Sequence, residues 1–355
     1  FLMKIAFSDF DGTLYFHHED IIPQINIKAV NEWRSKGNIF VLCSGRDVHS
    51  LMHEVNNQEL TYDFVICNNG GTIFDKNLKL IKSFPLDEIQ LEKLVHSDIA
   101  KESWHILFSS AEKMRTTINS PKSQLLKYFE SEKYKNQDII QKITVEQALS
   151  EMNVIQISLA YETEEIANNY AKRINNEFEG AFLANMNLNC IDICAKGINK
   201  AQGVKELLNL QNTADLLTLR KTLENTKMLS SDVSAGFDPL FAGVNDPKNS
   251  AYLGNGIVFN KYTGSRGKSG SNDASAEFIG KLRKVMDDAA VYFQMAELGK
   301  VDAGGGGTIA YILANLDMNV IDSGIAVQNM HAPYEVISKA DLYETLKGYE
   351  AFLQM

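Results

Sequence analysis

The first 75 residues alternate between strand and helix patterns, and this alternation restricts the fold more than any other feature of the chain. Apolar runs occur at 4–9, 38–44 and 62–68, and amphipathic segments at 24–36 and 47–57 separate them. A strand, helix, strand order implies parallel strands joined by right-handed crossovers. The sequence therefore predicts an α/β domain, with reactive groups at the carboxyl ends of its strands.

The rest of the chain predicts further domains. Residues 76–188 mix helical segments with alternating strands such as 154–162, which indicates a separate α+β insert. A strand and a helix at 189–210 are expected to return to the first sheet, so that 1–75 and 189–210 form one domain. Periodicity weakens at 211–217, which we interpret as a junction, and 218–355 predicts a second, partial α/β domain.

Composition excludes several classes of partner. The chain has 355 residues, of which 45% are hydrophobic and 23% charged, as in globular proteins. A net charge of −10 argues against binding to nucleic acid or an anionic membrane, and no apolar run approaches 18 residues. The four cysteines form no C-x-x-C pair, which favours buried free thiols in a reducing compartment. We therefore expect a cytoplasmic protein without a signal peptide.

Two carboxylates in "DFDGTL" follow the first predicted strand. A carboxylate such as Asp9 can attack phosphorus, and a second at Asp11 can protonate the leaving oxygen and later activate water. Gly12 allows close approach of the backbone, and Thr13 can donate to a phosphate. Taken alone, a D-x-D sequence is more often a turn that follows a strand.

Three further motifs place polar residues where such a site needs them. "CSGR" provides Ser44, "NNGG" provides Asn69, and "KGINKAQG" provides Lys200 at the start of a helix. Each is weak alone, because a serine there is usually a helix cap and a lysine is usually solvated. In this order, however, the set resembles the haloacid dehalogenase superfamily, and within it the Cof-type phosphatase-like branch, over about residues 3–209.

The resemblance implies a Rossmann-like core with a cap, and a role for each matched residue. Asp9 would be the nucleophile, Asp11 the acid/base and Lys200 the charge-stabilising lysine, with Asp9 and Asp11 also binding Mg²⁺. The phosphate-binding residues would be Thr13, Ser44, Gly45 and Asn69. The cap at 76–188 would select a small phosphorylated metabolite. The family's fourth motif, G-D-x-x-N-D, has no match after Leu210; "GVNDP" at 243–247 lacks the preceding aspartate.

A second group of polar residues lies in the last third of the chain. Asp232 and His331 each follow a predicted strand, and both residue types can bind Zn²⁺. Two ligands are too few for a zinc site, and a lone histidine is more often a hydrogen-bonded loop residue. The stretch around Gly267-Lys268-Ser269 is not a P-loop, because Tyr262 stands where that motif requires glycine.

Four stretches within 218–353 resemble the M18 zinc aminopeptidases. They are "LENTKMLSSDV", "KYTGSRGKSGSNDA", "ELGKVDAGGGGTI" and "MHAPYEVISKADLY". The resemblance implies Asp232 and His331 as zinc ligands, with a short peptide as substrate and oligomerisation through this half. The peptide-binding residues would be Lys261 and the 304–308 loop, including Gly306, Gly307 and Thr308. The family's other ligands and its catalytic glutamates precede this region, and Glu297 does not replace them.

The chain thus resembles two partial hydrolases, and three hypotheses remain open. The phosphatase-like half could be active through a carboxylate that we have not identified. The aminopeptidase-like half could be active with ligands from elsewhere in the chain or from another chain. Alternatively, neither half is catalytic, and the chain is a fusion remnant, an assembly error or an oligomerising module. We favour the phosphatase, because its nucleophile, acid/base and lysine are all present.

Overall fold

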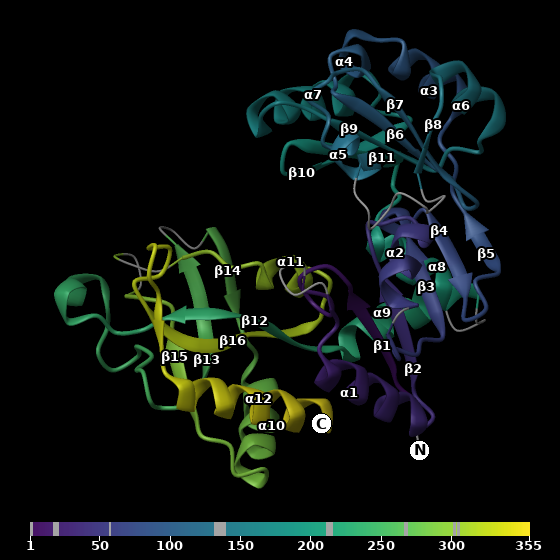
Figure 1. Ribbon diagram of the computed structural model, residues 1–355. Coiled ribbons are helices and arrows are strands. Elements are labelled where there is room, and N and C mark those ends of the chain that lie inside the picture. The colour runs from purple at the N-terminus through teal and green to yellow at the C-terminus, as the bar shows by residue number, and fades with distance from the viewer. Residues whose placement is uncertain are drawn as a thin grey trace. The chain divides into compact units, whose positions relative to one another are not determined.

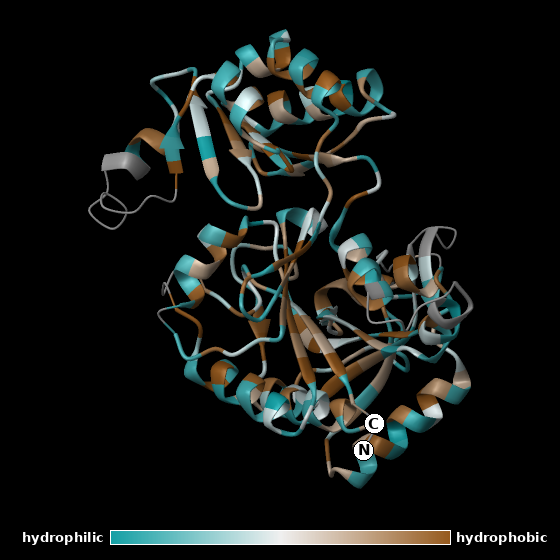
Figure 2. Ribbon diagram, turned by 90° about the vertical axis from the view of Figure 1, so that its right-hand side faces the viewer, coloured by the Kyte–Doolittle hydropathy of each residue, from teal (hydrophilic) through white to brown (hydrophobic). Residues whose placement is uncertain are grey.

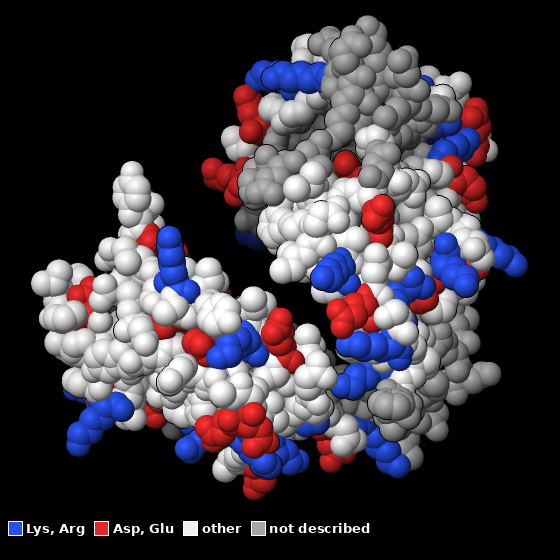
Figure 3. Space-filling view, turned by 60° about the horizontal axis from the view of Figure 1, so that its bottom comes forward, with Lys and Arg blue, Asp and Glu red and all other residues white. Residues whose placement is uncertain are grey.

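The computed structural model describes residues 3–16, 21–56, 58–130, 140–210, 216–265, 269–300, 303 and 306–355. The chain forms two compact units, residues 1–213 and 214–355, and we consider each by itself. Among the helices described, none combines the length and apolarity that a membrane crossing requires. On the face in Figure 3, basic and acidic side chains are interspersed, and no extended basic patch is visible there.

The first sheet of the first unit, which we call the core sheet, has the strand order β1-β2-β3-β4-β5. Its strands are β1 (Ile5–Asp9), β2 (Ile39–Cys43), β3 (Phe64–Cys67), β4 (Thr72–Asp75) and β5 (Leu80–Ser83). The first three are parallel, and β4 and β5 continue the sheet antiparallel. Its helices are α1 (Gln24–Ser35), α2 (Val48–Val55) and α8 (Lys200–Leu210), with a 3-10 turn η1 (Asn68–Gly70) (Figure 1). The predicted alternation of parallel strands and helices is confirmed.

The interior strands of the core sheet are buried on both faces, which explains their continuous apolar runs. Val41, Leu42, Val65 and Ile66 are fully buried. Helix α2 begins where the side chain of Asp47 accepts hydrogen bonds from two backbone N–H groups of its first turn. The predicted start of this helix at residue 47 therefore agrees with the capping chemistry at Asp47.

Two glycines hold the start of α8 against the turn η1. Gly70 has a φ of +97°, and a Cβ there would overlap the carbonyl oxygen of Asn199. A Cβ on Gly203 would lie 3.0 Å from the Cα of Gly70. The backbones of η1 and α8 therefore touch directly, without side chains between them.

The second sheet of the first unit, which we call the cap sheet, has the order β10-β11-β9-β6-β7-β8. Its strands are β6 (His105–Ser109), β7 (Met114–Ile118), β8 (Ile140–Lys142), β9 (Gln156–Ala160), β10 (Phe182–Asn187) and β11 (Cys190–Ala195). Its helices are α3 (Glu88–Val95), α4 (Asp98–Lys101), α5 (Gln124–Glu130), α6 (Val145–Glu151) and α7 (Glu164–Glu177). The expected α+β insert is present.

One expected boundary differs in the structure. We assigned the strand in 189–210 to the core, but β11 pairs antiparallel with both β9 and β10 and so belongs to the cap sheet. From this stretch, α8 packs on the core elements β3, β4 and η1. Strand pairing depends on residues far away in sequence, so the local pattern of β11 could not reveal its partner.

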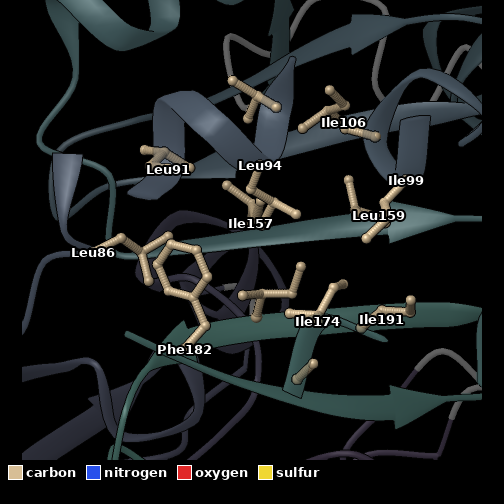
Figure 4. Packing of buried hydrophobic residues seen from close by; sticks show 14 of the residues in the cluster. Leu86, Leu91, Leu94, Ile99, Ile106, Ile157, Leu159, Ile174, Phe182 and Ile191 are labelled. Atoms are coloured by element: carbon tan, nitrogen blue, oxygen red, sulfur yellow. The ribbon is translucent and has the colours of Figure 1, made fainter. Parts of the chain in front are cut away.

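The two faces of the cap sheet differ in polarity. Helices α3, α4, α6 and α7 cover one face, where apolar side chains from helices and strands form a single cluster. Figure 4 shows Leu94, Ile106, Ile157, Leu159 and Phe182 packed in this cluster. Because strand residues alternate between faces, the residues between these apolar positions project from the opposite face.

The second unit contains one mixed sheet with the order β12-β16-β13-β14, in which β15 pairs with β13 and β17 with β16. Its strands are β12 (Lys227–Ala235), β13 (Ile257–Ser265), β14 (Ser269–Asp273), β15 (Phe293–Glu297), β16 (Asn319–Gln328) and β17 (Val336–Ile337). Its helices are α9 (Leu216–Asn225), α10 (Ala276–Asp288), α11 (Ala310–Ala314) and α12 (Lys339–Leu353), with a 3-10 segment η2 (Pro239–Val244).

Helices α10 and α12 pack together and supply the apolar core of the second unit with β13 and β16. Phe259, Phe278 and Ile321 are buried in this core. Hydrophilic and hydrophobic bands lie side by side on the helices of both units, as expected for helices that cover a sheet (Figure 2).

Candidate functional site

The first candidate site lies at the carboxyl end of β1. Asp9 is the last residue of that strand, and its Oδ1 accepts a hydrogen bond from the backbone N–H of Phe10 at 2.8 Å. Lys200, the first residue of α8, donates from Nζ to the same Oδ1 at 2.7 Å. The structure therefore brings together two predicted residues of this site that lie 191 positions apart in sequence.

The neighbouring carboxylate of Asp11 is held by Arg46. The guanidinium donates from Nη2 to Asp11 Oδ1 at 2.7 Å and from Nε to Asp11 Oδ2 at 3.0 Å. It also lies 5.5 Å from the centroid of the Phe10 ring and 5.5 Å from that of Tyr15. Sequence reasoning quoted this arginine within "CSGR" but assigned it no role. Its position two residues after a predicted strand end was the available signal.

The four predicted phosphate-binding residues have different environments. Ser44 is fully buried, and its Oγ accepts from the backbone N–H of Arg46 at 3.1 Å. Thr13 is exposed in the turn after β1. Gly45 and Asn69 line the cavity described next, and the Asn69 side chain donates to Gln156 Oε1 at 3.3 Å. Asn69 therefore contacts the cap as well as the core.

A cavity of about 670 Å³ contains this site. The core contributes Asp9, Asp11, Arg46 and Lys200 to its lining. The cap sheet contributes the polar residues Ser109, Gln156, Ser158, Asn185, Asn187 and Asp192 and the apolar residues Leu107, Met114 and Met186. Sequence reasoning missed these cap residues, although polar residues at every second position of 156–158 were a signal for one face of a strand.

Asp192 is the carboxylate that the cap strands add to this lining. It lies in register with Ser158 on β9 and with Asn185 on β10. Ser158 Oγ donates to Asp192 Oδ1 at 2.5 Å. Burial raises the pKa of Asp192, and hydrogen bonding from Ser158, Asn69 and Asn187 opposes that rise.

The four cysteines are free thiols, as expected. Burial raises the pKa of Cys43 and of Cys194 to about 12, and that of Cys190 to about 11. Their thiols stay protonated at neutral pH and are weak nucleophiles, although Cys43 ends β2 beside the site. The chemistry of the cavity therefore rests on its carboxylates, its two cations and its neutral polar side chains.

The donor chemistry at the end of β1 suits Mg²⁺. Asp9 and Asp11 supply hard oxygen ligands, and Mg²⁺ is commonly held by one or two carboxylates together with substrate phosphate and water. Within the described residues, no group of three or more His, Cys, Asp or Glu side chains forms a potential metal cluster. Asp246, from "GVNDP", lies in the second unit and stabilises a local turn by accepting from Lys248 N at 3.0 Å.

The second candidate site has a different character. Asp232 was expected after its strand, but it lies within β12, whose parallel pairing with β16 extends to Ala235. It is exposed, and its Oδ1 accepts from the N–H of Val233 at 2.7 Å. His331 follows β16 as expected, in an exposed turn where its backbone N–H donates to Glu335 Oε1 at 2.6 Å.

The predicted peptide-binding residues of this unit make local contacts. Lys261 on β13 forms an ion pair with Asp273 on β14. Thr308 Oγ1 lies 3.3 Å from Thr263 Oγ1, and Gly306 and Gly307 are partly or fully exposed. Helix α11 begins at Ala310, shortly after this loop. Several predicted positions lie outside the described residues: Gly304 and Gly305 of the predicted loop, residues 211–215 of the predicted junction, and Gly267 and Lys268.

Known proteins with a similar sequence include bacterial aminopeptidases. The probable M18 family aminopeptidase 1 of Clostridium acetobutylicum is 62% identical over 150 residues, which are 42% of this chain and 32% of that protein. Its counterpart in Thermotoga maritima is 44% identical over 154 residues, which are 43% of this chain and 34% of that protein. The matched part spans about a third of the length of these relatives.

Solved structures resemble each part of the chain. The crystal structure of aminopeptidase I from Clostridium acetobutylicum has 61% sequence identity and a TM-score of 0.37, and it covers 41% of this chain and 33% of its own. A haloacid dehalogenase-like hydrolase from Bacteroides thetaiotaomicron has 18% identity and a TM-score of 0.47, and it covers 68% of this chain and 85% of its own.

Two family models each match more than half of the chain. One describes haloacid dehalogenase-like hydrolases and matches residues 6–216; the other describes the aminopeptidase I zinc metalloproteases (M18) and matches residues 144–353. Residues 144–216 fall in both matches. The structure describes 144–210 of this range, which contain β9, β10 and β11 of the cap sheet and belong to the first unit. Both expected resemblances are confirmed: the chain belongs to the haloacid dehalogenase-like hydrolases and to the M18 zinc metalloproteases.

Proposed function

We propose that the first unit is a Mg²⁺-dependent phosphatase that hydrolyses small phosphate monoesters. The contact between Lys200 Nζ and Asp9 Oδ1 is the observation that carries this proposal. It joins a cation from a late helix to a carboxylate at the end of the first strand, inside a cavity that also contains Asp11. A cation beside a carboxylate suits attack on an anionic phosphoryl group, because it offsets the repulsion between them.

The side chains can divide the reaction into two displacements. Asp11 enters the first displacement in its protonated form. Asp9 attacks phosphorus, the bond from phosphorus to the leaving oxygen breaks, and Asp11 gives that oxygen its proton. Asp11 then takes a proton from a water molecule, whose oxygen attacks the phosphorus of the acyl phosphate on Asp9. The bond between phosphorus and the Asp9 oxygen breaks and inorganic phosphate leaves, so Asp9 is again a carboxylate and Asp11 again carries its proton. Lys200 and Arg46 remain positively charged throughout, next to the developing negative charge.

Asp9 and Asp11 would hold Mg²⁺. When bound, the ion would supply positive charge to the phosphoryl oxygens. Arg46 keeps the Asp11 carboxylate oriented by its two hydrogen bonds.

Replacement of the nucleophile tests the proposal. Asp9→Asn preserves the shape of the side chain but removes the attacking oxygen anion, so we expect hydrolysis of para-nitrophenyl phosphate with Mg²⁺ to fall at least about a thousandfold. Asp75→Asn, at the end of β4, is the matched control because it makes the same chemical change outside the cavity lining. Equal rates for Asp9→Asn and the parent would overturn the proposal.

A further inference from the structure

The wall of the cavity opposite the catalytic carboxylates is built from one face of the cap sheet. Ile157 and Leu159 on β9, and Ile191 and Ile193 on β11, point into the apolar cluster under the cap helices. The intervening Ser158 and Asp192 line the cavity. Because the two positions are in register on paired strands, their side chains are direct cross-strand neighbours.

The charged groups of the cavity are distributed unevenly. On the core side, Asp9 contacts Lys200 and Asp11 contacts Arg46, so each of these carboxylates has a cationic partner. The core-side carboxylate of Asp47 is instead held at the start of α2, where it accepts hydrogen bonds from the backbone N–H groups of His49 and Ser50. The partners recorded for Asp192 are the side chains of Ser158, Asn69 and Asn187. All three are uncharged. In the described part of the lining, Asp192 is thus a carboxylate that neutral groups hold in place.

A carboxylate in this setting discriminates among leaving groups. It can accept hydrogen bonds, and nearby amide and hydroxyl side chains can both donate and accept. A leaving group that bears hydroxyls complements this surface. A leaving group with a second anionic group would face a carboxylate without a cation beside it, which is unfavourable.

We propose that Asp192 selects the leaving group of the phosphate monoester, accepting a hydrogen bond from a neutral, hydroxyl-bearing leaving group and excluding one with a second negative charge. This inference rests on the proposed phosphatase activity and adds the class of substrate to it. The phosphate would lie toward Lys200 and Arg46, and the polyol toward Asp192 and Ser158.

Three substrates separate this role from a structural one. Sorbitol 6-phosphate has a neutral polyol leaving group, 3-phosphoglycerate has a carboxylate in its leaving group, and para-nitrophenyl phosphate has no hydroxyl donor there. The full-length protein is assayed with Mg²⁺ for kcat/KM on each, as the parent and as Asp192→Asn and Asp192→Ala. Asp98→Asn is the matched control, because Asp98 lies on α4 of the cap, pairs with Arg173 and is outside the cavity lining.

We expect both Asp192 variants to lose about tenfold to a hundredfold in kcat/KM for sorbitol 6-phosphate, the range for a hydrogen bond to a charged group. For para-nitrophenyl phosphate the change should stay within about twofold, which also demonstrates that the variants are folded. The ratio of 3-phosphoglycerate to sorbitol 6-phosphate hydrolysis should rise at least about tenfold.

A common factor for all three substrates, or no change in any, would overturn the role of Asp192 but leave the phosphatase proposal intact. If the parent protein hydrolyses none of the three esters, the phosphatase proposal itself fails, and the inference about Asp192 fails with it.

Discussion

The predicted site residues contact one another in the first unit, whereas in the second unit they make local contacts. In the first unit, residues separated by 191 positions meet in one contact, Lys200 to Asp9, and a second cation holds Asp11. In the second unit, Asp232 is exposed on a paired strand and His331 is exposed in a turn, each with a local hydrogen-bond partner. Membership of a hydrolase family therefore does not by itself assemble a site from the residues that are present.

The difference follows from topology. Parallel strands β1 and β2 both end at the same edge of the core sheet, and α8 starts close to that edge, so chain geometry gathers their terminal residues. In the second unit, β12 continues past Asp232 in register with β16. Asp232 is thus one position within a ladder and does not project from its end.

The comparison predicts that a substitution can destabilise one unit without affecting the other. Gly324 pairs with Asp232, and a Cβ there would overlap the Asp232 carbonyl oxygen. We expect Gly324→Ala to destabilise the second unit by about 4 kcal/mol or more, measured by urea unfolding, while phosphatase activity persists. Gly280→Ala is the control, because no atom lies within 4 Å of its Cβ position in α10; it should leave stability unchanged or raise it slightly. Loss of phosphatase activity in Gly324→Ala would contradict separate units.

One lysine in each unit forms an ion pair with an aspartate, and replacing each in turn tests which site supports phosphatase activity. Lys200→Met removes the cation beside the nucleophile, so we expect kcat for para-nitrophenyl phosphate to fall about 10² to 10³-fold. Lys261→Met removes a lysine of the second unit that is also paired with an aspartate, and phosphatase activity should not change. Similar losses in both variants would mean that the lysines act through general stability.

Acid should destabilise the first unit through one buried histidine. Burial lowers the pKa of His105 to about 4, whereas an exposed histidine titrates near 6.5. The unfolded state therefore binds the proton first, and stability falls as pH drops from about 6.5 to about 4, by on the order of 3 kcal/mol. His105→Gln should reduce this pH dependence of the unfolding free energy. His331→Gln changes an exposed residue of the second unit and should leave the pH dependence of the first unit's unfolding free energy unchanged. If both variants change this pH dependence equally, His105 is not its source.

Changing the contact between Arg46 and Asp11 should reduce activity less than removing Lys200. Arg46→Lys keeps the charge but loses the two-point contact with Asp11, so we expect about a tenfold decrease in kcat/KM for para-nitrophenyl phosphate. Arg46→Met should reduce it further. If lysine supports full activity, charge alone is sufficient and the fixed orientation of Asp11 is not important.

Zinc should produce the smallest effect. Asp232 and His331 alone are fewer ligands than a tetrahedral site needs. We expect no stoichiometric zinc in purified protein by metal analysis, no rise in the melting temperature with added zinc, and no cleavage of Asp- or Glu-terminal peptides. Two zinc ions per chain would show that the second unit does form a metal site and would indicate ligands supplied by another chain.

Local periodicity was sufficient to predict the strands and helices at the start of the first unit. The expected strands at 38–44 and 62–68 correspond to β2 and β3, and the expected helices at 24–36 and 47–57 correspond to α1 and α2. These elements bury one face or both, so hydrophobic spacing identifies them without knowledge of their partners. The sheet to which β11 belongs and the length of β12 depended on pairing with distant strands, which local spacing does not encode.

The candidate site was partly predictable for a related reason. Asp9 and Lys200 could be found because each stands at the boundary of a recognisable element. Asp192 could not, because the alternation of β11 shows that its two faces differ but not which face lies over the cavity. Arg46 was quoted but given no role, since an arginine in a loop is usually solvated.

The contact between Gly70 and Gly203 has a consequence for mutational tolerance. Neither residue carries a side chain, yet together they fix how closely the first turn of α8 approaches the edge of the core sheet. Any larger residue at Gly70 would push the backbone of Asn199, and with it Lys200, away from Asp9. In a deep mutational scan for phosphatase activity, these two positions should therefore be as intolerant of substitution as the nucleophile, although neither can take part in the reaction.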